Sequence, residues 1–361
     1  MSDSPLSVFY SLTVFDPAPS VGEGLWAAPA LVEQAAAVAL RMKMPHIFFA
    51  NLKKFGLEKN LTEPTLAVFK KEEQAAVQRG LYWMARLRQV STLLTDAGVD
   101  FVPLKGSSLV TGVYEDPGLR YSLDLDIFID IAQFTRCRSA LEQKGFCLAP
   151  NQLKDGVFLD KGRECTFCGP DGGEVDVHYR FFQWHIERYV FKVQSADLFQ
   201  RRLRGGSWRG MPLDRLRKED ELYYLLLCMI NDHFSEFRYY ADADALARVH
   251  GRDLDWDRFA HEVHASPVRR YLTAMMRFMA EDLHTPLPDG LLKGGHEKAV
   301  VIPVLDRIFS RRLFYFMAAK RFCDKINLVC VFVLWKAFTA FGLFRRYFVK
   351  RNNPQGAKIA P

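Results

Sequence analysis

Two aspartates one residue apart, Asp124 and Asp126, interrupt an otherwise apolar run in the first half of the chain. Leu125 and Ile127 alternate with them, and alternate side chains of a β-strand point to opposite faces. The two carboxylates are therefore expected to share one face, while the aliphatic side chains are buried on the other. Two negative charges held this close repel each other and raise the pKa of one of them. A divalent cation removes this conflict, and Mg²⁺ prefers such hard oxygen ligands. The alternative is an edge strand with solvated acids.

A second apolar run repeats the pattern further along the chain. Glu174, Asp176 and His178 occupy alternate positions in it. If the two runs are neighbouring strands, three carboxylates meet, which is the arrangement of a two-metal site for in-line displacement at phosphorus. We expect Asp176 to be the third carboxylate, with Glu174 as the alternative. His178 is expected to pack or to form hydrogen bonds rather than to catalyse.

The residues upstream of the acidic pair suit phosphate binding. Lys105, Gly106, Ser107 and Ser108 follow a short apolar run and open a predicted helix. A glycine lets the backbone approach a ligand closely, and the free N–H groups of a helix N-terminus bind phosphate oxygens. Arg120 can hold a phosphate through two parallel hydrogen bonds. A surface charge, or an ion pair with an acid, is the alternative role of Lys105 and of Arg120.

The remaining pattern predicts an α+β fold with a small mixed sheet. Helical periodicity and an alanine-rich stretch favour helices over residues 28–54 and 65–97. Short β-rich runs separated by Gly, Pro and Asp predict a mixed sheet with helices against it over 101–180. From residue 217 onward the pattern is helical again. In this last part, Asp242 and Asp244 are expected on a helix surface, with contact to a nucleotide or acceptor as the alternative.

The segment LKGSSL…GLRYSLDLDIFI and the later VDVHYR resemble the family of uncharacterised nucleotidyltransferases, part of the DNA-polymerase-β-like nucleotidyltransferase superfamily. That superfamily has a Gly-Ser after a strand, then a hydrophobic–Asp–hydrophobic–Asp strand, then a third acidic residue on a neighbouring strand. The matching positions here are Gly106, Ser107, Asp124, Asp126 and Asp176. The resemblance covers roughly residues 80–260 and leaves the N-terminal helices and the C-terminal segment outside.

The resemblance implies transfer of a nucleoside monophosphate from an NTP to an acceptor hydroxyl or phosphate. Asp124 and Asp126 would ligate two Mg²⁺ ions that bridge the triphosphate. Asp176 would ligate the metal nearest the acceptor and help to deprotonate its hydroxyl. Lys105 and Arg120 would steady the departing pyrophosphate, since such a transition state needs positioning and electrostatic stabilisation. The acceptor is left open among a protein side chain, a sugar, a lipid and a small molecule.

The chain is expected to divide into five regions. They are an N-terminal helical region (1–98), a nucleotidyltransferase core (99–215), a helical domain (216–300), basic hydrophobic C-terminal helices (301–351) and a disordered tail (352–361).

The net charge of +7 is concentrated near the C-terminus. Residues 301–351 contain eleven lysines or arginines and two acids, a net charge of +9, so the rest of the chain is close to neutral. Such a segment suits an anionic membrane surface or an acidic partner. Its aromatic residues have the helical spacing of a core rather than that of a stacking platform, so nucleic acid is not favoured.

Residues 326–344 carry a single charge, Lys336, at their centre. Their length is close to that needed to span a bilayer, but a central lysine costs about 2.5–3.5 kcal/mol on insertion. Burial against the domain, attachment to a membrane surface and a membrane span remain three alternatives, in that order of preference.

Seven cysteines spread over 361 residues fit a reducing compartment. The N-terminus has no basic region before an apolar run, as a secretory signal has, so we expect a cytoplasmic protein, with peripheral attachment to the inner membrane as an alternative. Two other functions compete with catalysis: a catalytically idle NTP-binding scaffold, and a membrane-peripheral accessory protein of an envelope-glycan or peptide-modifying pathway. The three intact aspartates argue against the idle scaffold.

Overall fold

The structure is a computed structural model that describes residues 4–25, 28–120, 122–149, 162–181, 194–231, 236–266, 268–292, 300–302 and 316–318. The chain forms two compact units, Met1–Lys293 and Gly294–Pro361. In the second unit, β8 (Val300–Ile302) pairs antiparallel with β9 (Phe316–Ala318).

Four short helices begin the first unit, and each starts with a proline, which suits the first helical position. They are α1 (Pro5–Thr13), α2 (Pro19–Leu25), α3 (Pro29–Arg41) and α4 (Pro45–Lys54). The single helix expected over residues 28–54 is wrong, because the chain breaks between α3 and α4. Lys43 has a φ of +57°, and Pro45 disfavours a helical conformation at the residue before it.

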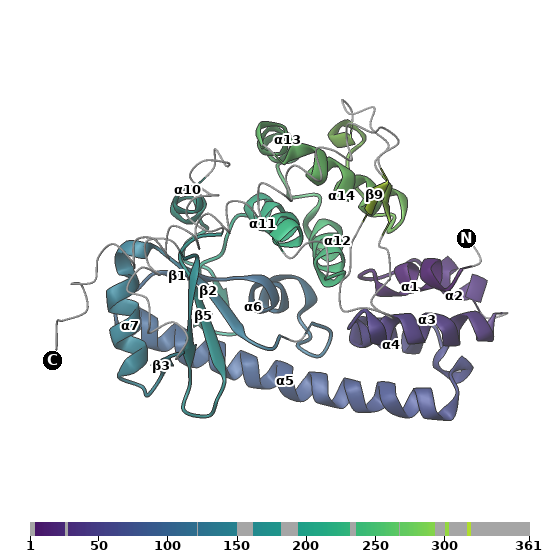
Figure 1. Ribbon diagram of the computed structural model, residues 1–361, viewed down its shortest axis with the longest axis horizontal. Coiled ribbons are helices and arrows are strands. Elements are labelled where there is room, and N and C mark those ends of the chain that lie inside the picture. The colour runs from purple at the N-terminus through teal and green to yellow at the C-terminus, as the bar shows by residue number, and fades with distance from the viewer. Residues whose placement is uncertain are drawn as a thin grey trace, which may run out of the picture. The chain divides into compact units, whose positions relative to one another are not determined.

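A helix of 34 residues, α5 (Glu63–Asp96), connects these helices to the sheet, after the short 3₁₀ helix η1 (Glu58–Asn60). Figure 1 shows α5 running along one side of the unit, from α3 and α4 to the strands. Phe69 packs against Phe49 of α4, with ring centroids 5.4 Å apart. Gly98, with a φ of +63°, follows the C-terminus of α5 and allows the chain to turn there.

The sheet has five strands in the order β1-β2-β5-β4-β3. Their bounds are β1 (Phe101–Pro103), β2 (Leu125–Ile129), β3 (Cys147–Leu148), β4 (Glu164–Cys168) and β5 (Glu174–His178). Strands β2 and β5 are parallel neighbours, and all other pairs are antiparallel. Two of the predicted β-rich runs form the hairpin β4–β5. The two acidic strands, β2 and β5, are neighbours, as expected.

The two faces of this sheet have different roles. Leu125 and Ile127 of β2 and Val175 and Val177 of β5 lie in a hydrophobic core with side chains of α5 and of α7 (Phe134–Glu142). Before α7, the carboxylate of Asp130 accepts a hydrogen bond from the N–H of Ala132 and caps η3 (Ile131–Gln133). The opposite face carries the acidic side chains.

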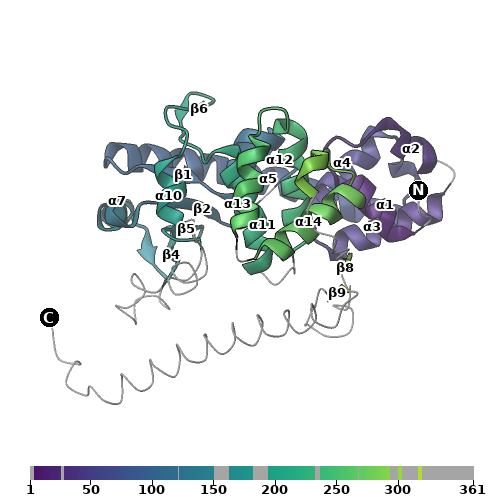
Figure 2. The ribbon, with the colours of Figure 1, turned by 90° about the horizontal axis from the view of Figure 1, so that it is seen from above.

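The second half of the unit consists mainly of helices, and a small hairpin lies between the first of them and the rest (Figure 2). The helices are α10 (Ser195–Gln200), α11 (Lys218–Asn231), α12 (Arg238–His250), α13 (Trp256–Ala265), α14 (Arg269–Glu281) and η4 (Asp289–Leu292). The hairpin consists of β6 (Ser207–Trp208) and β7 (Met211–Pro212). The fold is thus α+β, with a small mixed sheet between helical regions, as predicted.

Asp242 and Asp244 are fully buried in α12, so their expected position on a helix surface is wrong. Alanines alternate with them, and these small side chains let neighbouring elements approach α12 closely. Each acid is tolerated because it has an arginine partner. Asp242 pairs with Arg120, and Asp244 pairs with Arg248.

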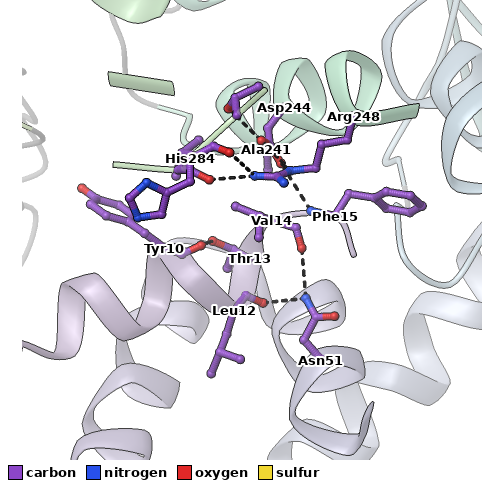
Figure 3. A network of polar contacts seen from close by, with 12 residues as sticks. Tyr10, Leu12, Thr13, Val14, Phe15, Asn51, Ala241, Asp244, Arg248 and His284 are labelled. Carbon is purple, nitrogen blue, oxygen red and sulfur yellow. Dashed lines mark hydrogen bonds and ion pairs between the residues drawn. The ribbon is translucent and has the colours of Figure 1, made fainter. Parts of the chain in front are cut away.

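Asp244 also joins α12 to the start of the chain (Figure 3). Its carboxylate accepts hydrogen bonds from the N–H of Phe15, at 3.4 Å, and from the hydroxyl of Thr285, at 2.7 Å. Asn51 of α4 donates to the carbonyl groups of Leu12 and Val14. The N-terminal helices are therefore bound to the helical half by polar contacts as well as by packing.

None of the helices within the described residues is both long enough and apolar enough to cross a membrane. The predictions for residues 326–344 and for the tail 352–361 lie outside the described residues.

Candidate active site

Three carboxylates meet where β2 and β5 run side by side. Asp126 lies in β2 directly opposite Asp176 of β5, and Asp124 immediately precedes β2. One potential ligand oxygen from each of the three lies within 4.8 Å of the others. Strand β2 is flanked by β1 and β5, and Asp126 is only 3% exposed. The alternative of an edge strand with solvated acids is therefore wrong.

The electrostatics of the cluster fit a cation site. Burial, together with the charge of Asp126, raises the pKa of Asp124 to about 6. Burial also raises the pKa of Asp176, against a hydrogen bond from Thr166 that lowers it. Buried carboxylates that resist ionisation for lack of a counter-charge are well suited to a divalent cation. An all-oxygen donor set of this kind fits Mg²⁺.

Asp126 has two nitrogen partners on a single oxygen. Lys105 Nζ donates to Oδ1 at 2.6 Å, and His178 Nε2 lies 2.7 Å from the same atom. Although burial alone would raise the pKa of Asp126, these two neighbours hold it below its usual range. Oδ2 receives no such contact from the described residues and is the oxygen best placed to ligate a metal.

His178 bridges the metal-site face and β4. Its Nδ1 lies 3.0 Å from Oε2 of Glu164. The other carboxylate oxygen of Glu164, Oε1, lies 3.1 Å from Arg163 Nη2. Burial would lower the pKa of His178, but Glu164 and the bond to Asp126 raise it. Both ring nitrogens therefore face carboxylates, and the expectation that His178 forms hydrogen bonds is confirmed.

Sequence reasoning missed two residues of β4 that support the site. Glu164 is paired in register with His178, and Thr166 is paired with Asp176. The hydroxyl of Thr166 donates to Asp176 Oδ1 at 2.6 Å. Directly opposite residues of a hairpin are close neighbours, so the register of the predicted hairpin was the signal that could have identified them.

Gly106 and the two serines lie at the start of α6 (Lys105–Leu109), which is followed by the π-helical turn η2 (Val110–Tyr114). A Cβ at Gly106 would lie 1.9 Å from Ser122 Oγ, so a larger residue there would require the Ser122 side chain to move. Ser107 is buried, and its hydroxyl donates to the carbonyl groups of Leu104 and Asp126. Ser108 is buried too. Ser107 therefore anchors α6 against β2.

Arg120 is buried and held by Asp242. Its Nε lies 2.8 Å from Oδ1 and its Nη2 lies 2.8 Å from Oδ2 of that carboxylate. The hydroxyl of Tyr114 donates to Asp242 Oδ1 at 3.0 Å. Lys105 and Arg120 were both predicted to bind phosphate. In the structure each forms an ion pair instead, Lys105 with Asp126 and Arg120 with Asp242.

Comparison with known proteins gives one match. The sequence model of the family described as uncharacterised nucleotidyltransferase matches residues 29–284. No curated protein and no solved structure matches the chain significantly. The matched region includes α3, α4 and all of α5, so the expectation that the resemblance begins near residue 80 is wrong. Because the match covers well over half of its length, the chain belongs to the family of uncharacterised nucleotidyltransferases.

Proposed function

We propose that this protein transfers a nucleoside monophosphate from an NTP to an acceptor hydroxyl or phosphate, with Mg²⁺ held by Asp124, Asp126 and Asp176. One observation carries the proposal: the three carboxylates converge within 4.8 Å on two parallel strands in register. This is the frame that a two-metal phosphoryl-transfer site requires. It is also the arrangement of the polymerase-β-like enzymes, to which we assign the chain.

In this reaction the acceptor oxygen forms a bond to the α-phosphorus, and the bond from that phosphorus to the pyrophosphate oxygen breaks. Bound Mg²⁺ supplies the charge that offsets the negative charge of the triphosphate and of the attacking oxygen. Asp176 lies toward the β4 side of the cluster and receives the proton of the acceptor hydroxyl. Asp124 and Asp126 orient the donor, and the backbone at Gly106 binds its phosphate oxygens.

Lys105 lies where its ammonium group can contact either Asp126 or the phosphates of the donor. Its ammonium group contacts Asp126, and the charge of Asp126 raises its pKa although burial lowers it. We assign to Lys105 the role of binding the departing pyrophosphate, which its ammonium group reaches by turning away from Asp126 Oδ1. The same ion pair also fits a catalytically idle NTP-binding scaffold, in which Lys105 neutralises Asp126 permanently.

The cell location and partners follow from the sequence. We assign the protein to the cytoplasm, with the basic segment 301–351 contacting an anionic membrane surface. The acceptor is a protein side chain, a sugar, a lipid or a small molecule.

The test is a thermal-shift titration with each of the four NTPs, with and without Mg²⁺. Wild-type protein is compared with Asp124→Asn plus Asp126→Asn, and with a control that removes two exposed acids, Asp96→Asn plus Asp257→Asn. A ligand at one hundred times its Kd stabilises the folded state by about 2.7 kcal/mol. We expect a Mg²⁺-dependent shift with one NTP in the wild type and control, and none in the site variant.

Formation of labelled product from that NTP then separates catalysis from mere binding. A shift that persists in the site variant, or no shift with any NTP, would contradict the donor site. Binding without turnover across a panel of acceptors of all four classes would favour the scaffold.

A further inference from the structure

A cavity of about 70 Å³ opens beside the carboxylate cluster, within the first unit. Three segments form it: the turn between α3 and α4, the loop that leads into β2, and the residues at the start of α12. Leu123 lines it and is the residue before Asp124. Arg238 also lines it and is close enough to Asp124 to lower the pKa of that carboxyl, against the raising effect of burial. The cavity and the cluster are therefore adjacent.

The charged lining of this cavity is predominantly positive. Lys43, Arg120 and Arg238 face it, with Glu236 as the acid among its lining residues. The charge of Arg120 is balanced by Asp242. Glu236 is shared between Lys43 at 3.8 Å and Arg238 at 4.0 Å, both longer than hydrogen bonds. One carboxylate thus faces two cations, which leaves one positive charge without a counter-charge in the cavity.

Arg238 has a donor that the protein leaves unused. Its Nε is buried and has no hydrogen-bond partner among the described residues. Buried polar groups are nearly always paired, and an exception indicates a missing partner. Lys43 is 64% exposed, so its ammonium group is free to move toward a ligand. The Arg238 side chain as a whole is 31% exposed, so both cations are open to an anion that enters from solvent.

The size and charge of the cavity suit one tetrahedral oxyanion. A single water needs about 10–15 Å³ of such space, so the cavity has room for a group the size of a phosphate. Arginine and lysine are the usual ligands of phosphate, through hydrogen bonds strengthened by charge. The two cations also lie on the Asp124 side of the cluster rather than on the β4 side, where Thr166 binds Asp176.

We infer that this cavity binds a phosphate group, with Lys43 and Arg238 as its contacts. Lys43 and Arg238 thus bind the phosphate that Arg120 was first expected to bind. Arg120 itself is held in an ion pair by Asp242. Two sources carry this chemistry: the terminal phosphate of the NTP donor, and a phosphate on the acceptor. The inference deepens the proposed function. Only the identity of the molecule that carries the phosphate, NTP donor or acceptor, rests on that function.

The binding test uses inorganic phosphate, measured by isothermal titration calorimetry in EDTA. Wild-type protein is compared with Lys43→Gln plus Arg238→Gln and with a control that removes two exposed cations elsewhere, Lys71→Gln plus Arg252→Gln. We expect binding to the wild type and control, and at least about tenfold weaker binding to the cavity variant, because each charge-assisted hydrogen bond contributes at least that much. Equal binding in all three proteins, or no binding to the wild type, would overturn the inference.

Glu236→Gln provides the opposite test, since it removes the competing carboxylate but leaves both cations. It should bind phosphate several-fold more tightly than the wild type. Unchanged or weaker binding would contradict the competition between Glu236 and phosphate. A thermal unfolding midpoint recorded without ligand shows that each variant is folded.

A second titration series identifies the source. With Mg²⁺ present, weaker binding of NTP but unchanged binding of NMP by the cavity variant assigns the cavity to the terminal phosphate of the donor. Unchanged NTP binding with weaker binding of a sugar phosphate assigns it to the acceptor. Asp124→Asn plus Asp126→Asn should retain phosphate binding in EDTA, so failure of the donor site and failure of this cavity give different results.

Discussion

His178 lies between two carboxylates and is only 1% exposed. Asp126 faces one ring nitrogen at 2.7 Å, and Glu164 faces the other at 3.0 Å. The imidazole therefore fixes the orientation of Asp126 through Oδ1 and leaves Oδ2 available for a metal. A side chain that orients a metal ligand in this way commonly affects metal affinity as strongly as a ligand does.

Replacing His178 by Phe is expected to lower both stability and Mg²⁺ affinity. The change leaves Asp126 and Glu164 buried without their shared partner, and breaking such a pair costs about 3 kcal/mol. Urea unfolding measures the loss in EDTA, and calorimetric titration measures Mg²⁺ affinity. Glu164→Gln retains an acceptor for Nδ1 and should cost less in both. If His178→Phe lost stability but bound Mg²⁺ as the wild type does, His178 would be structural only.

The pKa of Asp124 predicts a pH dependence of stability in the metal-free protein. Burial raises this pKa to about 6, whereas an aspartate in the unfolded chain ionises near pH 3.9. Below about pH 4 the carboxyl is protonated in both states, and above about pH 6 the folded state contains a buried charge. The free energy of unfolding should therefore fall as the pH rises from about 4 to 6, by up to about 3 kcal/mol from this group.

Asp124→Asn should lack this part of the fall when urea unfolding is followed across that pH range in EDTA. Asp96→Asn, a change at an exposed acid, should leave the profile of the wild type intact. Mg²⁺ binds the ionised carboxylate, so its addition should stabilise the wild type more at pH 7 than at pH 5. Parallel profiles for the wild type and Asp124→Asn would show that Asp124 ionises normally.

At the scale of elements, the approach of α5 to the loop before β2 depends on one glycine. A Cβ at Gly80 would lie 2.3 Å from the carbonyl oxygen of Pro117. That loop leads into Arg120 and the acidic strand, so the contact positions the segment that carries the site. Helix propensity favours alanine over glycine by about 1 kcal/mol, but the clash is with backbone and cannot be relieved by a side-chain rotation.

Gly80→Ala should therefore destabilise the protein, by about 2 kcal/mol or more, as overpacking does. Gln74→Ala, at an exposed position of the same helix, should change the free energy of unfolding by no more than about 0.5 kcal/mol. Chemical denaturation of both variants measures the difference. A stabilised Gly80→Ala would mean that the loop moves away from α5 without cost.

The strands and the acidic pair could be predicted because both follow from local periodicity. Leu125 and Ile127 alternate with the acids, and a period of two places them on opposite faces whatever the rest of the fold does. The support from Glu164 and Thr166 depends on the register of a hairpin. The break between α3 and α4 was visible in Pro45, but the alanine-rich stretch before it and the helical spacing of apolar residues after it outweighed that signal.

Across the whole first unit, the contacts that sequence could not predict join residues far apart in the chain. Arg120 pairs with Asp242, 122 residues away, and nothing in the local pattern of either segment identifies the partner. An acid on a predicted helix is usually solvated, and only the tertiary fold shows that every residue of α12 from Tyr239 to Ala247 is buried. The same limit applied to the cavity, which three separate segments form.

The last prediction concerns the attachment of the N-terminal helices. Asp244 is fully buried and holds Arg248, Thr285 and the N–H of Phe15 together. Asp244→Asn removes the charge that Arg248 requires, so we expect a loss of about 3 kcal/mol in the free energy of unfolding. Because Phe15 connects α1 to this network, amide hydrogen exchange should accelerate most in α1 and α4.

A control for this prediction removes an acid whose ion pair is exposed. Asp253 contacts Lys218 at 3.1 Å and is 67% exposed, and exposed pairs contribute about 0–1 kcal/mol. Asp253→Asn should therefore leave both stability and exchange nearly unchanged. If Asp244→Asn destabilised the protein but accelerated exchange evenly over α1–α14, the network would support the whole unit. Exchange confined to α1 and α4 would instead establish that Asp244 fastens these helices, and with them the Lys43 side of the cavity, to the rest of the unit.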